Sequence, residues 1–344
     1  MRHRVFITQP VAASAITRLQ SLAKVEWNRD AMHIMTKEEL ISAVRGHDIL
    51  FCLLSDRVDA DVIAAGRSLS LIATMKITPS DIDVAAATAR RIPVTVVPPI
   101  VTEATADLHF AILLAVARRV VEGDKLLREG IFPGAQSMRL MGAAVWGKTI
   151  GLVGGGGRIG RAVARRAHGF SMRTLYWGPR RIPEEQEREL GLAYVPLDTL
   201  FAESDFVSVH APLKAETFHL IGSREMRLMK PSAFLINTAR GPVVDERALV
   251  EALGERRIAG AALDVFEREP EIEEALLAMS NVVLTPHLGS AVPEVRETMA
   301  NIVVDNIAAV VEGRRPPNCW NPEIYDDRGK EPSPTRARRE GEES

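Results

Sequence analysis

Three polar residues in the second half of the chain could act together on a carbonyl compound. Arg240 lies in the segment NTARG, Glu269 in DVFEREP and His287 in TPHLGS. An arginine can pair with a carboxylate and polarise a carbonyl oxygen, and a histidine can supply a proton near neutral pH. A carboxylate beside that histidine would favour the imidazolium and fix its orientation. This set suits hydride addition to a 2-oxoacid, followed by protonation of the resulting alkoxide.

A glycine-rich loop precedes these segments and could hold the hydride donor. The segment GGGRIG satisfies the pattern G-x-G-x-x-G through Gly155, Gly157 and Gly160, between a strand-like and a helix-like stretch. Such glycines allow a tight turn, the approach of a pyrophosphate to the backbone, and close packing of helix on strand. The first N–H groups of the helix then face the phosphates. The sequence predicts a dinucleotide site, and a P-loop is excluded because no Gly-Lys-Ser/Thr follows.

The loop after the next strand indicates which dinucleotide is bound. An NAD site normally places Asp or Glu there, on the ribose hydroxyls. This chain instead has Gly178, followed by Arg180 and Arg181. An acid would repel a 2′-phosphate, whereas glycine leaves room and guanidinium groups bind phosphate. We expect NADP(H) to be preferred and NAD(H) to be possible; the alternative is that the two arginines only form a solvated loop.

The elements that must position these residues alternate between apolar strands and amphipathic helices, which is typical of parallel α/β proteins. A single long helix is expected over 102–130, and further helices over 158–170 and 294–313. Strands are expected over 4–9, 48–54, 69–75, 92–97, 148–154, 173–178, 205–211, 233–239, 260–265 and 281–286.

We therefore predict an α/β fold with two domains. A doubly wound, parallel-sheet Rossmann coenzyme domain would span 101–287. A smaller, flavodoxin-like substrate domain would be discontinuous in sequence and combine 1–100 with 288–326. The polar and charged segment 327–344 is expected to be disordered.

Composition excludes several classes of function. The net charge of −2 over 344 residues gives no electrostatic signature of nucleic acid or of an anionic membrane. The two cysteines lack metal-ligand spacing, so no metal site and no disulfide are expected. No signal peptide is recognisable, and the longest apolar run (110–117) is far shorter than the about 20 residues that span a bilayer. We expect a soluble, cytoplasmic protein that acts on small molecules.

Taken with the glycine loop, NTARG, DVFEREP and TPHLGS resemble the D-isomer-specific 2-hydroxyacid dehydrogenases. The resemblance runs from about residue 45 to 322 and includes IDVAAATARRIPV, VTEATADL and RGPVVDERALVEAL. It implies that Arg240, Glu269 and His287 are catalytic, with His287 as proton donor. The Gly178 loop is most similar to NADPH-using glyoxylate/hydroxypyruvate reductases, which implies reduction of small 2-oxoacids to D-2-hydroxyacids. A homodimer formed through about 102–148 is also implied.

The resemblance implies a wider set of ligand contacts. Asp264 belongs to it, although Asp264 could equally be a hydrogen-bond acceptor at a strand end. The implied cofactor-binding residues are Thr105, Gly155, Gly157, Arg158, Ile159, Gly160, Gly178, Arg180, Arg181, Ala211, Pro212, Thr217, Thr238, Ala239, Asp264 and Gly289, and the implied substrate-binding residues are Leu54, Lys76, Ile77 and Thr78.

The chain departs from the family pattern at two places. Its glycine loop has one glycine more than usual, so the register of the glycines on the pyrophosphate is open by one position. In the segment MKITPSDID, Lys76, Ile77 and Thr78 replace a glycine-rich turn that would hold the substrate carboxylate. The amides of Ile77 and Thr78 could still serve. Lys76 either adds a cation for the substrate or points to solvent, and we favour the second.

Two alternative functions share this fold. One is a formate or phosphite dehydrogenase: formate enzymes of this type have Gln in place of Glu269, which argues against formate, whereas phosphite enzymes have a Lys in the substrate turn, as here with Lys76. The other is a nucleotide-sensing, corepressor-like binding protein, which can retain the Arg, Glu and His. Turnover of a 2-oxoacid would distinguish an enzyme from a binding protein.

Overall fold

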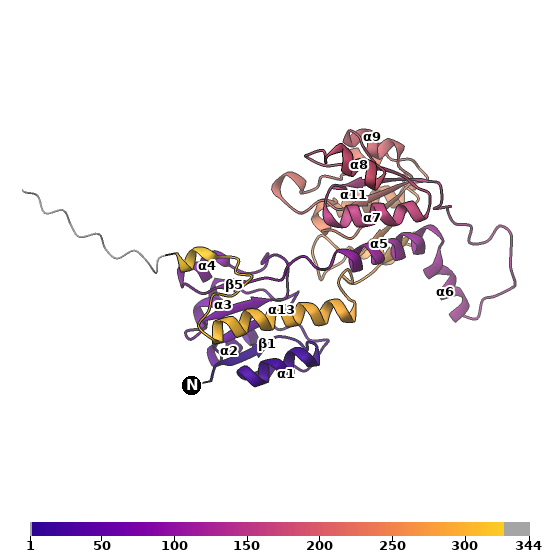
Figure 1. Ribbon diagram of the computed structural model, residues 1–344. Coiled ribbons are helices and arrows are strands. Elements are labelled where there is room, and N and C mark those ends of the chain that lie inside the picture. Colours follow the sequence, from indigo (N-terminus) through magenta and orange to yellow (C-terminus); the bar gives the residue numbers. More distant parts are fainter. Residues whose placement is uncertain (1, 327–344) are drawn as a thin grey trace, which may run out of the picture. The chain divides into compact units, whose positions relative to one another are not determined.

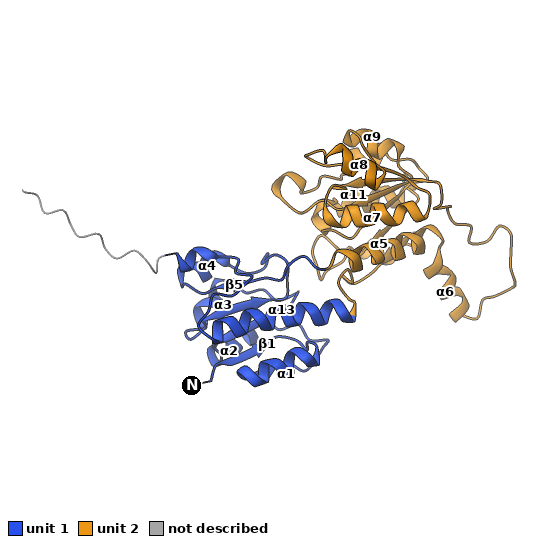
Figure 2. Ribbon diagram, in the orientation of Figure 1, with its two compact units in different colours: residues 1–100, 293–344 blue, residues 101–292 orange. Residues whose placement is uncertain are grey.

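The computed structural model describes residues 2–326, and Figure 1 shows their helices and strands, some of them labelled. They form two compact units (Figure 2): unit 1 contains the described residues up to Ile100 and from Pro293 onward, and unit 2 is Val101–Val292. The return to unit 1 therefore comes at Pro293 rather than at residue 288, because Thr285, Leu288 and Gly289 are hydrogen-bonded to Asp264 of unit 2. The predicted tail, 327–344, lies outside the described residues.

Unit 1 is built on a parallel five-stranded sheet in the order β2-β1-β3-β4-β5, the flavodoxin-like order. The strands predicted from apolar runs are present, but β2 was not predicted. Its residues alternate between exposed and half-buried at the sheet edge, so no apolar run marks it. The strands are β1 (Arg4–Ile7), β2 (Lys24–Trp27), β3 (Ile49–Cys52), β4 (Leu71–Thr74) and β5 (Val94–Thr95).

The last helix of the chain returns to unit 1, where α13 packs on α1 and β4. The segment after it is fixed to the sheet by the buried Asn321, whose side chain accepts from the Val94 N–H and donates to the Ile92 carbonyl. These contacts make the discontinuous unit one folded body. Its helices are α1 (Ala13–Leu22), α2 (Lys37–Gly46), α3 (Ala60–Ala65), α4 (Val84–Ala89), α13 (Pro293–Val311) and the 3₁₀ turn η3 (Pro322–Tyr325).

Unit 2 contains a parallel seven-stranded sheet in the order β12-β11-β10-β9-β6-β7-β8. Chain order runs outward from β6 in both directions, so a topological switch point lies between β6 and β9, where open α/β sheets bind ligands. The edge strand β8, which is largely exposed, was not predicted. The strands are β6 (Thr149–Val153), β7 (Arg173–Trp177), β8 (Leu192–Tyr194), β9 (Phe206–Val209), β10 (Phe234–Asn237), β11 (Gly260–Leu263) and β12 (Val282–Leu284).

Helices cover both faces of this sheet, which confirms the doubly wound Rossmann prediction. Ile150 and Leu152 pack with α5 and α7, whereas Val153 and Val207 pack with α9, α10 and α11. The helices and 3₁₀ turns are α5 (Thr102–Ala117), α6 (Val120–Arg128), α7 (Arg158–Gly169), α8 (Glu184–Leu190), α9 (Leu197–Glu203), η1 (Ala215–Thr217), α10 (Ser223–Leu228), η2 (Gly241–Val243), α11 (Glu246–Gly254) and α12 (Glu274–Leu277).

The prediction of one helix over 102–130 was wrong. The helix breaks at Arg119, which has a left-handed backbone (φ 54°) and pairs with Glu122 of the next turn. The break separates the largely buried α5 from α6, which has no buried residue. Within residues 2–326, no helix has the length and apolar character needed to cross a membrane.

Candidate active site

The predicted catalytic residues follow three neighbouring strands of unit 2. Arg240 follows β10, Glu269 follows β11 and His287 follows β12. The three strands are adjacent and parallel. Their carboxyl ends therefore meet at one edge of the sheet, the edge at which open α/β sheets bind ligands.

Glu269 and His287 form a hydrogen-bonded pair, with 2.8 Å between Oε2 and the imidazole Nδ1. The other carboxylate oxygen accepts the N–H of Phe266 at 3.0 Å. Burial opposes ionisation of Glu269, but the hydrogen bond and charge of His287 outweigh it. Arg240 adds a smaller effect, and the pKa of Glu269 lies below its ordinary value. Glu269 is thus an anion at neutral pH. Because Nδ1 of His287 is bound to Glu269, Nε2 is the nitrogen that can face a substrate.

Asn237 shapes the backbone around Arg240. Its side-chain oxygen accepts the N–H of Ala239 at 3.0 Å, and its amide donates to the Arg240 carbonyl at 3.0 Å. The Arg240 side chain is exposed and donates from Nη1 to the Ala239 carbonyl. The turn therefore fixes the Arg240 backbone and leaves most of the guanidinium donors for an anion.

Asp264 organises the loop that carries His287. Its Oδ1 accepts from the Thr285 hydroxyl at 2.6 Å and from the Leu288 N–H at 2.7 Å, while Oδ2 accepts from the Gly289 N–H at 2.9 Å. Its carbonyl accepts the His287 N–H at 3.0 Å. Burial, only partly offset by these hydrogen bonds, raises the pKa of Asp264. The contacts favour the reading of Asp264 as a strand-end acceptor; its predicted contact with the cofactor remains a prediction.

Two of the predicted cofactor residues contact each other. The Thr105 hydroxyl donates to the Gly289 carbonyl at 3.0 Å, which joins the first turn of α5 to the loop after β12. Both residues are buried. Helix α5 therefore supports the backbone next to His287.

A pair of glutamates that the sequence did not single out holds the loop of Glu269. The buried Glu246 accepts the N–H of Glu267 at 2.9 Å and that of Glu273 at 3.1 Å, and Glu267 accepts the N–H of Glu246 at 3.1 Å. Glu267 also contacts His219 Nε2 at 3.0 Å. Glu246 lies in the segment that resembles the family, but a helix-start glutamate gives no sign of a partner about twenty residues away. This reciprocal bonding fixes both ends of the loop.

The glycine loop fits a pyrophosphate. A Cβ on Gly160 would lie 2.6 Å from the Cα of Gly155, so these two positions require glycine for helix and turn to touch. Gly157 is the N-cap of α7, and a Cβ there would contact the Gly154 carbonyl oxygen at 3.3 Å and otherwise face open space among the described residues. This geometry favours the register through Gly155, Gly157 and Gly160. The additional glycine is Gly154, with φ 86°, whose Cβ would collide with the Ala211 backbone.

The other predicted cofactor residues border the same edge of the sheet. Ala211 and Pro212 follow β9, and the Thr217 hydroxyl donates to the Pro212 carbonyl at 2.6 Å. Arg158 and Ile159 open α7, and Thr238 and Ala239 follow β10. The buried Thr238 Oγ1 has no hydrogen-bond partner within residues 2–326. These residues fit a dinucleotide, and their individual contacts with it remain predictions.

The loop after β7 uses its two arginines differently. Arg181 donates to both carboxylate oxygens of Glu187, at 2.8 and 2.7 Å, rather than presenting a free guanidinium as the sequence suggested. Arg180 is exposed. A Cβ on Gly178 would meet its nearest atom, the Arg180 carbonyl oxygen, only at 3.7 Å. The loop therefore has room for a Cβ at Gly178.

The predicted substrate residues lie in unit 1, after the adjacent strands β3 and β4. Leu54 is half-buried, Ile77 half-buried and Thr78 exposed. The expectation that Lys76 points to solvent was wrong. Lys76 is 9 % exposed, and its ammonium binds the Asp81 carboxylate, because a buried cation needs a counter-charge. A role of these four residues in substrate binding remains a prediction.

Comparisons with known proteins identify the family to which this chain is related. The model of the D-isomer specific 2-hydroxyacid dehydrogenase NAD binding domain matches residues 110–289. A glyoxylate reductase of Thermococcus litoralis is 45% identical over 328 residues, covering 94% of this chain and 98% of that protein.

Solved structures match over a similar share of the chain. A protein of Thermus thermophilus has a TM-score of 0.84 and 42% identity, over 92% of this chain and 99% of that one. An NADPH-dependent glyoxylate/hydroxypyruvate reductase of Sinorhizobium meliloti has a TM-score of 0.73 and 31% identity, over 92% of this chain and 97% of that one. The chain belongs to the D-isomer-specific 2-hydroxyacid dehydrogenases, a family of NAD(P)-dependent oxidoreductases.

Proposed function

We propose that this protein reduces small 2-oxoacids such as glyoxylate or hydroxypyruvate to D-2-hydroxyacids with NADPH, and that His287 donates the proton. The observation that carries the proposal is the Glu269–His287 pair at 2.8 Å, beside Arg240 at the carboxyl ends of three adjacent strands. The names of the relatives support the substrate class: one is a glyoxylate reductase and another an NADPH-dependent glyoxylate/hydroxypyruvate reductase.

In the proposed mechanism each of the three residues has its own role. Arg240 binds the substrate carboxylate and polarises the C2 carbonyl. The nicotinamide, when bound, supplies the hydride that C2 receives. His287 then gives the proton on Nε2 to the carbonyl oxygen, which becomes the hydroxyl group. Glu269, held by the hydrogen bond to Nδ1, favours the imidazolium and fixes the ring.

The cofactor preference can be tested at Gly178. In Gly178→Asp the carboxylate would repel a 2′-phosphate and could bind the ribose hydroxyls. A Cβ on Gly178 would meet its nearest atom only at 3.7 Å, so the backbone position accepts a Cβ without a clash. We expect the ratio of kcat/KM for NADPH to that for NADH to fall by about tenfold or more, the effect of one strong charge interaction. Steady-state rates of glyoxylate reduction with both cofactors measure this ratio.

Gly178→Asn is the matched control, because it adds nearly the same volume without the charge. It should change the ratio much less than the Asp variant does. A wild-type enzyme with the same kcat/KM for NADH as for NADPH would contradict the proposed NADPH preference. An unchanged ratio in Gly178→Asp would contradict the role of Gly178 in that preference.

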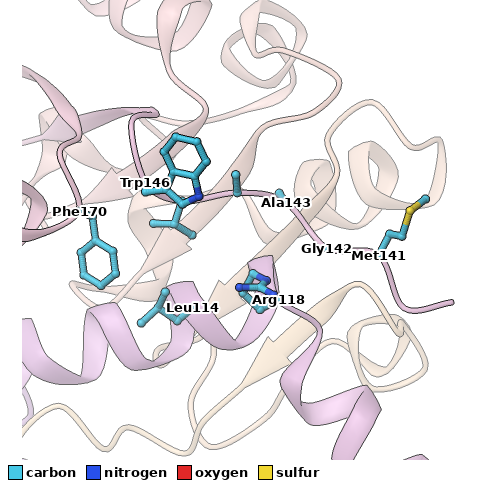
Figure 3. Close-up of a pocket in the computed structure, with 9 residues that line it drawn as sticks. Leu114, Arg118, Met141, Gly142, Ala143, Trp146 and Phe170 are labelled. Carbon is cyan, nitrogen blue, oxygen red and sulfur yellow. The ribbon is translucent and has the colours of Figure 1, made fainter. Parts of the chain in front are cut away.

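We also propose the homodimer that the family resemblance implies, formed through about residues 102–148. Exposed apolar side chains gather there, among them Phe132, Met138 and Trp146. Leu114, Trp146 and Phe170 help to line a hollow of about 460 Å³ on this surface (Figure 3). Such a concentration of exposed apolar groups marks an interaction surface.

Trp146→Glu tests the dimer because Trp146 is 75% exposed, so the change should leave the fold of the subunit intact. Sedimentation of the wild type should give twice the mass of the chain, and the variant should sediment with the mass of one chain. Thr149→Ser, a nearby substitution outside the apolar surface, should leave the dimer unchanged. A wild type with the mass of one chain would refute the dimer.

A further inference from the structure

Arg181, in the loop after β7, has a structural role. Its Nε and Nη2 donate to Glu187, whose Oε1 also accepts from the hydroxyl of the buried Tyr176 at 2.6 Å. The Tyr176 oxygen in turn accepts the Ile182 N–H at 2.9 Å. The hydrogen bonds from Arg181 outweigh burial and lower the pKa of Glu187 to about 2, so the ion pair persists at neutral pH. Two of the Arg181 nitrogens are therefore committed to holding the loop.

Arg161, in the first turn of α7, is held through one nitrogen of its guanidinium, and the other two nitrogens remain available. Its Nε donates to the Gly156 carbonyl at 2.8 Å, and the side chain is half-buried. Within residues 2–326, no hydrogen bond or ion pair joins its Nη1 or Nη2 to protein. Arg161 thus holds two donor nitrogens, Nη1 and Nη2, beside the glycine loop.

The direction of Arg161 follows from the helix it occupies. His168 lies seven residues later, about two turns, so both side chains project from the same face of α7. The His168 ring lies against Gly191, between α8 and β8, where a Cβ would overlap it. This face of α7 therefore points toward the side of the sheet that carries β7 and β8.

The glycine loop, to which Arg161 is hydrogen-bonded, also contacts the loop after β7. A Cβ on Gly156 would lie 2.9 Å from Cγ2 of Ile182, so the glycine loop touches the residue that follows the two arginines. Arg161, bound to the Gly156 carbonyl, is consequently a neighbour of the loop that holds Gly178 and Arg180. In Rossmann domains the adenosine ribose is bound at this strand end.

We infer that Arg161 and Arg180, rather than Arg181, bind the 2′-phosphate of NADPH. The inference rests on the proposed NADPH preference and assigns the residues that produce it. A 2′-phosphate carries more than one negative charge and several acceptor oxygens, which suits two guanidinium groups approaching from different elements. Arg161 comes from the glycine-loop helix and Arg180 from the loop after β7, whereas Arg181 acts on the cofactor only by shaping that loop.

Arg161→Gln tests this assignment with 2′,5′-ADP and 5′-AMP, which differ by the 2′-phosphate alone. Calorimetric titration of the purified protein should show about a ten- to hundredfold loss of affinity for 2′,5′-ADP, the effect of losing charged hydrogen bonds. Affinity for 5′-AMP should change by less than about twofold. Arg180→Gln should behave in the same way, and the KM for NADPH should rise in both variants.

Arg165→Gln is the matched control, since it removes an arginine from the same helix that pairs with Glu103 instead. It should bind both nucleotides as the wild type does. Arg161→Gln that retains the wild-type preference for 2′,5′-ADP would overturn the assignment and leave the NADPH proposal standing. A wild type that binds 2′,5′-ADP no better than 5′-AMP would overturn both.

Discussion

His287→Asn is expected to lower kcat for glyoxylate reduction by about 10²- to 10⁴-fold, the contribution of a positioned general acid. Asparagine cannot donate a proton to the developing alkoxide, and its shorter side chain cannot reproduce the bond between Nδ1 and Glu269. NADPH binding should change little, because the predicted phosphate contacts lie at the glycine loop and the loop after β7. Steady-state kinetics with a separate titration of NADPH binding measure the two effects.

A companion variant shows whether the loss comes from proton transfer. Glu269 is an anion at neutral pH, because its pKa is below the ordinary value. In Glu269→Gln the imidazolium loses this counter-charge, so the pH above which reduction declines should move to lower values. A His287→Asn enzyme with nearly wild-type kcat, or an unmoved pH profile in Glu269→Gln, would contradict the role of the pair.

Arg240→Met is expected to lower kcat/KM for 2-oxoacids by about 10²- to 10³-fold, comparable to the loss of one electrostatic donor at a reacting oxygen. The loss should appear in both KM and kcat, because the guanidinium holds the carboxylate and polarises the carbonyl. Arg240→Lys should recover only part of the activity, since an ammonium lacks the planar pair of donors. Kinetics over a range of glyoxylate concentrations separate the two parameters.

Arg247→Met is a suitable control because Arg247 is a strongly exposed arginine of α11 with no role in the proposed site. Its kinetics should match those of the wild type. If Arg240→Met raised KM alone, Arg240 would bind the substrate without stabilising the transition state. If neither parameter changed, the assignment of Arg240 would be wrong.

The sequence was most informative about functional residues that directly follow buried strands. Arg240, Glu269 and His287 follow apolar runs that read clearly as buried strands, and consecutive parallel strands tend to be neighbours. The spacing of the last two allowed them to meet at adjacent strand ends, and the structure places them 2.8 Å apart. The glycine pattern was readable as a dinucleotide loop for the same reason, since a strand and a helix flank it.

The features that the sequence did not reveal depend on partners far along the chain. The ion pair of Arg181 requires Glu187 of the next helix. The hydrogen bonds that hold the loop of Glu269 require Glu246. In the sequence alone, neither glutamate can be distinguished from a glutamate that is exposed to solvent. The edge strands β2 and β8 were missed because strands with exposed residues carry no apolar run. The break at Arg119 was missed because local helix propensity continues through it.

One measurement tests the central claim most directly: the purified protein is mixed with NADPH or NADH and each of glyoxylate, hydroxypyruvate and pyruvate, and cofactor oxidation is followed by absorbance. The proposal predicts turnover with a higher kcat/KM for NADPH than for NADH, and D-glycerate as the product from hydroxypyruvate. Tight NADPH binding without oxidation by any of the three acids, or formation of L-glycerate, would contradict it.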